Sequence, residues 1–142
     1  MTEPRAITDD DPAMAELLRA AAAVQARAHA PYSRFKVGAA VRAGGKTFAG
    51  ANVENASYGL SCCAERTAVF AAVLAGAHPV DMVAVYTDAA PPSSPCGACR
   101  QVLNEFAPDL SILSLGVDGT EQRWTMTDLL PAPFEFRPPV ET

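Results

Sequence analysis

Two short cysteine motifs constrain this chain more than any other feature of its sequence. Residues 61–66 read Ser-Cys-Cys-Ala-Glu-Arg, so a thiol and a carboxylate stand two positions apart. Residues 94–101 read Ser-Pro-Cys-Gly-Ala-Cys-Arg-Gln and place two further thiols at a C-x-x-C spacing. Three thiolates can hold a zinc ion and leave its fourth position open to water, which is the pattern of a catalytic zinc site. The predicted ligands are Cys63, Cys96 and Cys99, with Glu65 as the nearby proton carrier.

The spacing within each motif predicts where it lies on a helix. Residues two apart in a helix differ by about 200° of rotation, so Cys63 and Glu65 can converge on one ion only at a helix start. Cys96 and Cys99 are three apart and share a helix face, and Pro95 before them suits a first turn. We therefore expect two helix N-termini to meet at the metal, where their positive dipole ends favour thiolate over thiol.

Two arginines follow the predicted ligands and bear on the charge of the site. Three thiolates around one zinc ion leave an excess of negative charge, which makes bound water less acidic. Arg66 either donates hydrogen bonds to the thiolates and restores that acidity or is a solvated charge on the helix surface, and both interpretations stay open. For Arg100 the favoured interpretation is the solvated surface charge.

The composition narrows the class of protein. A chain of 142 residues fits one domain, residues 1–142, with a real hydrophobic core. The net charge is −5 and the 11 Lys and Arg residues are scattered, whereas a binder of long nucleic acid should show a basic patch. No signal peptide or membrane span is visible, so we expect a cytoplasmic protein. Its four cysteines are then better explained as metal ligands than as disulfides, which leaves Cys62 as a free thiol.

Hydrophobic periodicity predicts strands that alternate with helices. Such a pattern is typical of a three-layer α/β/α domain, with helices on both faces of a mixed sheet of about five strands. His29 is expected in the last turn of the first helix, with a structural role. Residues 1–11 and 135–142 are expected to be irregular tails. The predicted helices are 14–29, 63–75, 96–106 and 127–130, and the predicted strands are 36–43, 46–52, 80–87, 110–115 and 122–126.

Taken together, these motifs and several further segments resemble the small, single-domain cytidine deaminases. Zinc base deaminases share an H-x-E motif, or Cys in place of His, followed by P-C-x-x-C. The most specific segment is Asn-Val-Glu-Asn-Ala-Ser-Tyr at residues 52–58, which points to a nucleoside. The resemblance runs from about residue 31 to residue 134. It is carried by residues 32–40 (Tyr-Ser-x-Phe-x-Val-Gly-Ala-Ala), 52–58, 63–66, 95–102 and 129–134.

The resemblance implies hydrolytic deamination of cytidine and 2′-deoxycytidine to the uridine product and ammonia, in pyrimidine salvage. It implies one zinc ion per subunit and a homotetramer whose subunits share their active sites, with no nucleic-acid or membrane partner. It also implies a role for each of several residues. Cys63, Cys96 and Cys99 bind zinc, Glu65 shuttles the proton, Asn52 and Glu54 bind the ribose hydroxyls, Phe35 packs near the base, the Ala64 amide donates to the pyrimidine carbonyl, and Phe134 closes over a neighbour's base.

Three other interpretations remain. The first is another deaminase of the same superfamily, which would act on blasticidin S, on guanine or on adenosine in transfer RNA. The acidic net charge argues against an RNA substrate, and the sequence of residues 54–58 argues against blasticidin S. The second is a non-catalytic zinc-stabilised binding module with Cys62 as fourth ligand, which leaves Glu65 without a role. The third is a dithiol oxidoreductase built on residues 96–99, which leaves residues 63–65 unexplained.

Overall fold

Within residues 9–140 the chain forms five strands and four α-helices, and two pairs of strands follow each other directly in the sequence. A computed structural model describes residues 9–140, so residues 1–8 and 141–142 of the expected tails lie outside the described part. Residues 130–140 follow the last helix without regular structure. The elements are α1 (Pro12–Gln25), β1 (Val37–Ala43), β2 (Lys46–Ala51), the 3₁₀ turn η1 (Tyr58–Leu60), α2 (Ala64–Leu74), β3 (Val80–Thr87), α3 (Gly97–Phe106), β4 (Ser111–Gly116), β5 (Glu121–Thr125) and α4 (Met126–Leu129).

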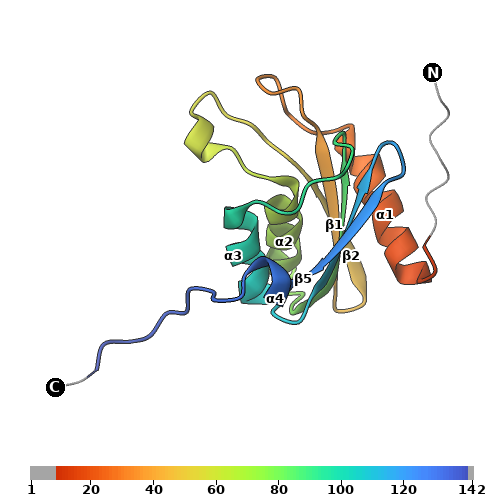
Figure 1. The fold of residues 1–142 in the computed structure, drawn as a ribbon. Coiled ribbons are helices and arrows are strands. Elements are labelled where there is room, and N and C mark those ends of the chain that lie inside the picture. The colour runs from red at the N-terminus through yellow and green to blue at the C-terminus, as the bar shows by residue number, and fades with distance from the viewer. Residues whose placement is uncertain (1–8, 141–142) are drawn as a thin grey trace.

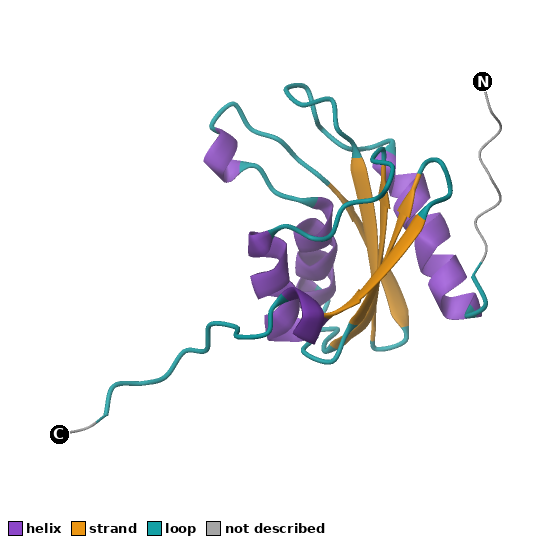
Figure 2. Cartoon of the chain, viewed as in Figure 1, coloured by secondary structure: helices purple, strands orange, loops and turns teal. Residues whose placement is uncertain are grey.

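The strands form one mixed sheet in the order β2-β1-β3-β4-β5. Strand β1 is antiparallel to β2 and β3, β3 is parallel to β4, and β4 is antiparallel to the edge strand β5. Helix α1 covers one face of the sheet, and α2, α3 and α4 cover the other (Figures 1 and 2). The predicted three-layer α/β/α architecture with a mixed sheet is therefore confirmed. Among residues 9–140, no helix has the length and apolar character needed to cross a bilayer.

Each face of the sheet has its own hydrophobic core. On β1, Ala39 and Val41 pack with α2 and α3, while Ala40 between them packs with α1, as the two-residue period of a strand requires. Helix α1 contributes a stripe of buried residues at helical spacing. That stripe consists of Met14, Leu17, Leu18 and Ala21.

Two glycines on adjacent strands allow the helices to lie close to the sheet. A Cβ atom at Gly38 would overlap the carbonyl oxygen of Ala21 in α1. A Cβ atom at Gly50 would overlap the backbone of Thr67 and Ala68 in α2. At Gly50 the hydroxyl oxygen of Thr67 would also be overlapped, but at both glycines the overlap includes helix backbone, which cannot move aside as a flexible side chain could. The absence of a side chain at these positions therefore sets the spacing between sheet and helix on both faces.

We expect Gly50→Ala to destabilise the fold by about 1–3 kcal/mol or more, because the added methyl group must push α2 away from β2. The measurement is the free energy of unfolding in urea. Gly59→Ala is the matched control, since a Cβ there meets no atom within 4 Å; its effect should stay within about 0.5 kcal/mol. Equal stability of the two variants would contradict this explanation of the spacing.

The first helix is shorter than predicted. It ends at Gln25, and His29 instead forms a parallel β-bridge with Val53. The His29 amide donates to the Asn52 carbonyl at 2.9 Å, and the Glu54 amide donates to the His29 carbonyl at 2.8 Å. The expectation that His29 lies in the last helical turn is therefore wrong, because pairing with a distant segment overrides the local helical propensity.

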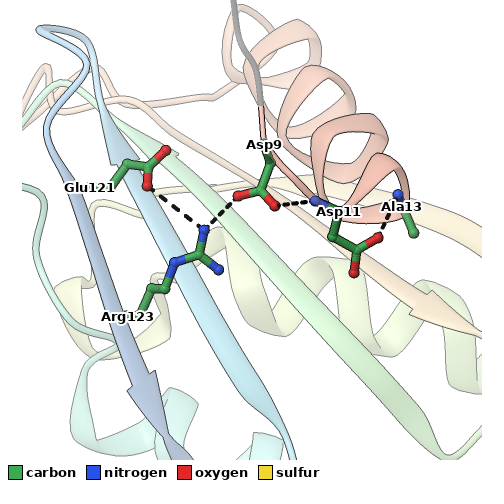
Figure 3. Close-up of polar contacts among 5 residues, drawn as sticks. All are labelled: Asp9, Asp11, Ala13, Glu121 and Arg123. Carbon is green, nitrogen blue, oxygen red and sulfur yellow. Dashed lines mark hydrogen bonds and ion pairs between the residues drawn. The ribbon is translucent and has the colours of Figure 1, made fainter.

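The N-terminal approach to α1 is tied to the edge strand β5 (Figure 3). The guanidinium of Arg123 forms ion pairs with Asp9 and, at 3.7 Å, with Glu121. The Asp9 carboxylate also accepts a hydrogen bond from the Asp11 amide, and the Asp11 side chain in turn caps α1 by accepting from the Ala13 amide, both at 2.9 Å. The start of α1 is thus held against the opposite edge of the sheet from β2.

Candidate metal centre and active-site cavity

Three thiols converge where the N-termini of α2 and α3 meet. Cys63 is the N-cap of α2, Cys96 is the N-cap of α3, and Cys99 lies in the first turn of α3. Their sulfur atoms all lie within 4.8 Å of one another, and those of Cys63 and Cys96 are 3.7 Å apart. The expected meeting of two helix N-termini is therefore present in the fold.

The chemistry of this thiol set suits a divalent cation. A hydrogen bond from Cys99, together with one from Arg66, lowers the pKa of Cys63 to about 5. The same bond and burial raise the pKa of Cys99, because ionising it would place two thiolates side by side. All three cysteines can be deprotonated at once only if a positive charge, such as a bound metal ion, lies next to them. Three soft sulfur ligands fit zinc, whose binding requires deprotonated cysteines.

Arg66 contacts the thiol set directly. Its Nη2 donates to the Cys63 sulfur at 3.5 Å and to the Ser61 carbonyl at 3.4 Å. The contact with Cys63 in turn raises the pKa of the guanidinium, which stays charged. The sequence left open whether Arg66 hydrogen-bonds to the ligand sulfurs or is a solvated surface charge. The structure agrees with the first interpretation, because Arg66 donates to the Cys63 sulfur.

Arg100 is not a solvated surface charge, and that interpretation is wrong. Its side chain donates to the Pro95 carbonyl at 2.8 Å, to the Ser94 hydroxyl at 2.9 Å and, at 3.0 Å, to the carbonyl of Leu129 in α4. A guanidinium carries five donors in a fixed fork, and the end of α4 offers carbonyls that have no helical partner. Arg100 thus links the second cysteine motif to α4, a contact between segments that no local pattern could reveal.

A cavity of about 220 Å³ opens at the thiols. Glu65 lies in its wall and is only 6% exposed, and burial raises the pKa of this carboxyl group to about 7. Of the residues singled out in the sequence, the cavity brings together Phe35, Asn52, Cys63, Ala64, Glu65 and Cys96. The cavity also includes residues that sequence reasoning missed, namely Val37, Val85, Thr87, Ser93 and Ser94.

Glu54 and Phe134 lie outside this cavity. Glu54 accepts hydrogen bonds from the amides of Tyr32 and Ser33 at 3.0 and 3.1 Å and borders a separate cavity of about 430 Å³. Phe134 is 73% exposed in the C-terminal segment, which runs away from the body of the chain (Figure 1). Within one chain, the structure therefore separates these two residues from the thiols.

Cys62 stands apart from the other thiols. It is a half-buried free cysteine whose sulfur lies 3.8 Å from the Cys63 carbonyl oxygen, and it is not part of the group of sulfur atoms described above. Among residues 9–140, no fourth thiol joins Cys63, Cys96 and Cys99, which argues against the structural zinc site with Cys62 as the fourth ligand.

Comparison with known proteins decides the family. Residues 13–114 match the family described as the cytidine and deoxycytidylate deaminase zinc-binding region. The chain belongs to this family. It is therefore a member of the zinc-binding deaminases. The three cysteines Cys63, Cys96 and Cys99 form a group that could hold the zinc ion.

Individual relatives agree with this assignment. A cytidine deaminase of Halalkalibacterium halodurans is 50% identical over 116 residues, which cover 79% of this chain and 88% of that protein. A cytidine deaminase of Sporosarcina psychrophila is 43% identical over 110 residues, covering 76% of this chain and 81% of that protein. The crystal structure of a cytidine deaminase from Burkholderia pseudomallei superimposes with a TM-score of 0.80 at 48% identity, covering 84% of this chain and 97% of that one. These similarities support a deaminase over a dithiol oxidoreductase.

Proposed function

We propose that this deaminase-family protein hydrolyses cytidine, and 2′-deoxycytidine, to the uridine product and ammonia. The observation that carries the proposal is the buried carboxyl group of Glu65 in the same cavity as the thiol group. Zinc held by Cys63, Cys96 and Cys99 would supply a Lewis acid that makes water acidic enough to attack near neutral pH.

Glu65 is the proton carrier in this proposal. Its carboxyl group has a pKa of about 7, so it can both accept and donate a proton at neutral pH. Glu65 takes a proton from the attacking water, passes it to the ring nitrogen of cytosine, and returns a proton to the amine that leaves carbon four. One water molecule is consumed and one ammonia is released in each turnover.

Two neighbours of Glu65 support this chemistry. Arg66 offsets the negative charge of the thiolates through its contact with Cys63. The amide of Ala64 is at the first position of α2, where helix N–H groups have no partner inside the helix. We assign it to the pyrimidine carbonyl oxygen of the bound base.

The direct test is a metal assay combined with nucleoside turnover. The purified chain should contain one zinc ion per subunit, and the ultraviolet absorbance of cytidine should change as uridine forms. A preparation with full zinc content and no turnover of either nucleoside would refute the proposed function.

We assign the sugar of the substrate to Asn52 and Glu54 and the base to Phe35. The Asn52 amide is oriented by the backbone: Nδ2 donates to the Phe35 carbonyl and Oδ1 accepts from the Val37 amide, both at 2.8 Å. An amide nitrogen carries two N–H donors, so one remains for a ribose hydroxyl.

Cytidine should be strongly preferred over free cytosine. Without the sugar, the polar groups of Asn52 and Glu54 lose a partner, so kcat/KM for cytosine should be lower by about tenfold or more. The measurement is kcat/KM for the two substrates, with Asn52→Ala as the comparison in which the preference should shrink. Similar kcat/KM values for cytosine and cytidine would remove the sugar assignment.

We further propose a homotetramer of single-domain chains in which Phe134 completes a neighbour's site. The exposure of Phe134 and its separation from the cavity of its own chain support this assignment. The Phe134 backbone carbonyl accepts a hydrogen bond from the Gln101 side chain of α3 at 3.3 Å, while the Phe134 ring stays exposed.

A chain that ends just before Phe134 should show a raised KM for cytidine, because each base loses an apolar cover. A chain that ends just after Phe134 is the control and should keep the KM of the full chain. Light scattering on the same samples gives the oligomeric state. A fully active monomer would contradict shared active sites.

A further inference from the structure

The segment that presents Phe35 to the cavity has an unusual backbone conformation. Arg34, just before it, has φ of 60°, the left-handed region that residues with side chains rarely adopt. The Arg34 amide donates to the Ala30 carbonyl, and the Phe35 amide donates to the Ser33 hydroxyl, both at 3.0 Å. The backbone therefore turns sharply and then runs straight into β1 through Lys36 and Val37.

This short segment is held from two directions. On one side, the Asn52 side chain binds the Phe35 carbonyl and the Val37 amide. On the other side, both backbone groups of Lys36 bind side chains: its carbonyl accepts from Gln25 Nε2 at 2.9 Å, and its amide donates to Asp88 Oδ2 at 3.4 Å. Asn52 belongs to the cavity, whereas Gln25 and Asp88 do not line it.

Gln25 and Asp88 also bind each other. Gln25 Nε2 donates to Asp88 Oδ1 at 2.9 Å, so both donors of this amide are used and the two side chains form a closed ring with the Lys36 backbone. Gln25 is the last residue of α1, which lies close to β1 because Gly38 has no side chain. Asp88 directly follows β3, whose last residue, Thr87, lines the cavity.

We propose that Gln25 and Asp88 are positioning residues that hold Phe35 in place against the base of the substrate. The inference deepens the proposed function and rests on it. Neither residue touches the substrate, and both act through the Lys36 backbone on the direction of the neighbouring Phe35 side chain. Because Phe35 would pack against the base before and during the reaction alike, loss of this clamp should raise KM and leave kcat almost unchanged.

The first experiment compares three variants of the zinc-loaded enzyme. Gln25→Met keeps the length of the side chain and removes both donors, so KM for cytidine should rise roughly three- to tenfold, the scale of about one hydrogen bond, with kcat within about twofold. Gln25→Lys restores a donor and should return KM to within about twofold of the wild type. Gln122→Met, on the edge strand β5, is the matched control. An unchanged KM in Gln25→Met, or an equal rise in Gln122→Met, would overturn the proposal.

The second experiment asks whether the clamp acts through Phe35. In a Phe35→Ala background, adding Gln25→Met should leave KM unchanged, since the side chain to be positioned is gone. A further rise equal to that in the wild-type background would overturn the proposed route.

A third measurement does not depend on activity. In Asp88→Ala, the amide of Lys36 should exchange with solvent about tenfold faster or more by NMR, because it loses its acceptor. Unchanged exchange would refute the clamp. If the wild type failed to convert cytidine, the proposed function would be wrong. The exchange rate of the Lys36 amide would still decide whether Gln25 and Asp88 hold the segment before β1.

Discussion

Glu65→Gln should keep its zinc and lose turnover of cytidine by at least about 10²–10⁴-fold, the usual contribution of one general acid–base group. The amide keeps the shape of the side chain but cannot carry a proton between water, ring nitrogen and leaving amine. Because Glu65 is not a metal ligand in this proposal, zinc content should not change. Single-turnover rates and metal analysis on the same sample measure both quantities.

The control for this variant is Glu105→Gln, which makes the same chemical change at an exposed position of α3. It should keep both zinc and turnover. Near-normal turnover in Glu65→Gln would remove Glu65 from the mechanism, and loss of zinc in that variant would show that the carboxylate binds the metal.

Cys63→Ala should abolish both zinc binding and activity and should lower the thermal stability of the chain, since metal binding stabilises the folded state. Cys62→Ala should retain zinc, most activity and most stability. Both thiols belong to extended backbone just before α2, where successive side chains point to opposite sides of the chain, so they cannot occupy the same ligand position. The sulfur of Cys63 faces those of Cys96 and Cys99, whereas Cys62 remains outside the group.

The measurements are zinc per chain and the melting temperature of each variant. Loss of the metal in Cys62→Ala together with its retention in Cys63→Ala would shift the ligand assignment by one residue. The role of Glu65 would fall with it, because that role depends on the C-x-E register.

Local chemistry explains what could be predicted from the sequence. The strand Val80–Thr87 has the predicted bounds because its apolar run is confined by loops rich in turn-forming residues. The hairpin at Gly44 and Gly45 is where expected, and both glycines have positive φ, of 58° and 73°. The meeting of the thiols at two helix starts follows from spacing alone.

The missed features all depend on contacts between distant segments. The end of α1 is set by pairing of His29 with the loop after β2, and Arg100 is drawn into the fold by α4. The loop at Ser93 and Ser94 lines the cavity because of the way β3 and α3 are placed, and its own composition shows only an irregular segment. Neither hydrophobic period nor motif spacing carries such information.

The close approach of α1 to Gly38 changes how the motif at residues 32–40 should be interpreted. This motif helped to place the chain among the deaminases, yet Gly38 faces the backbone of Ala21 and does not line the cavity. The glycine at this position sets the thickness of the layer between helix and sheet. A substitution at Gly38 would disturb the packing of α1 on the sheet without changing the lining of the cavity. A search for altered substrate specificity should therefore leave Gly38 alone and vary Phe35 instead.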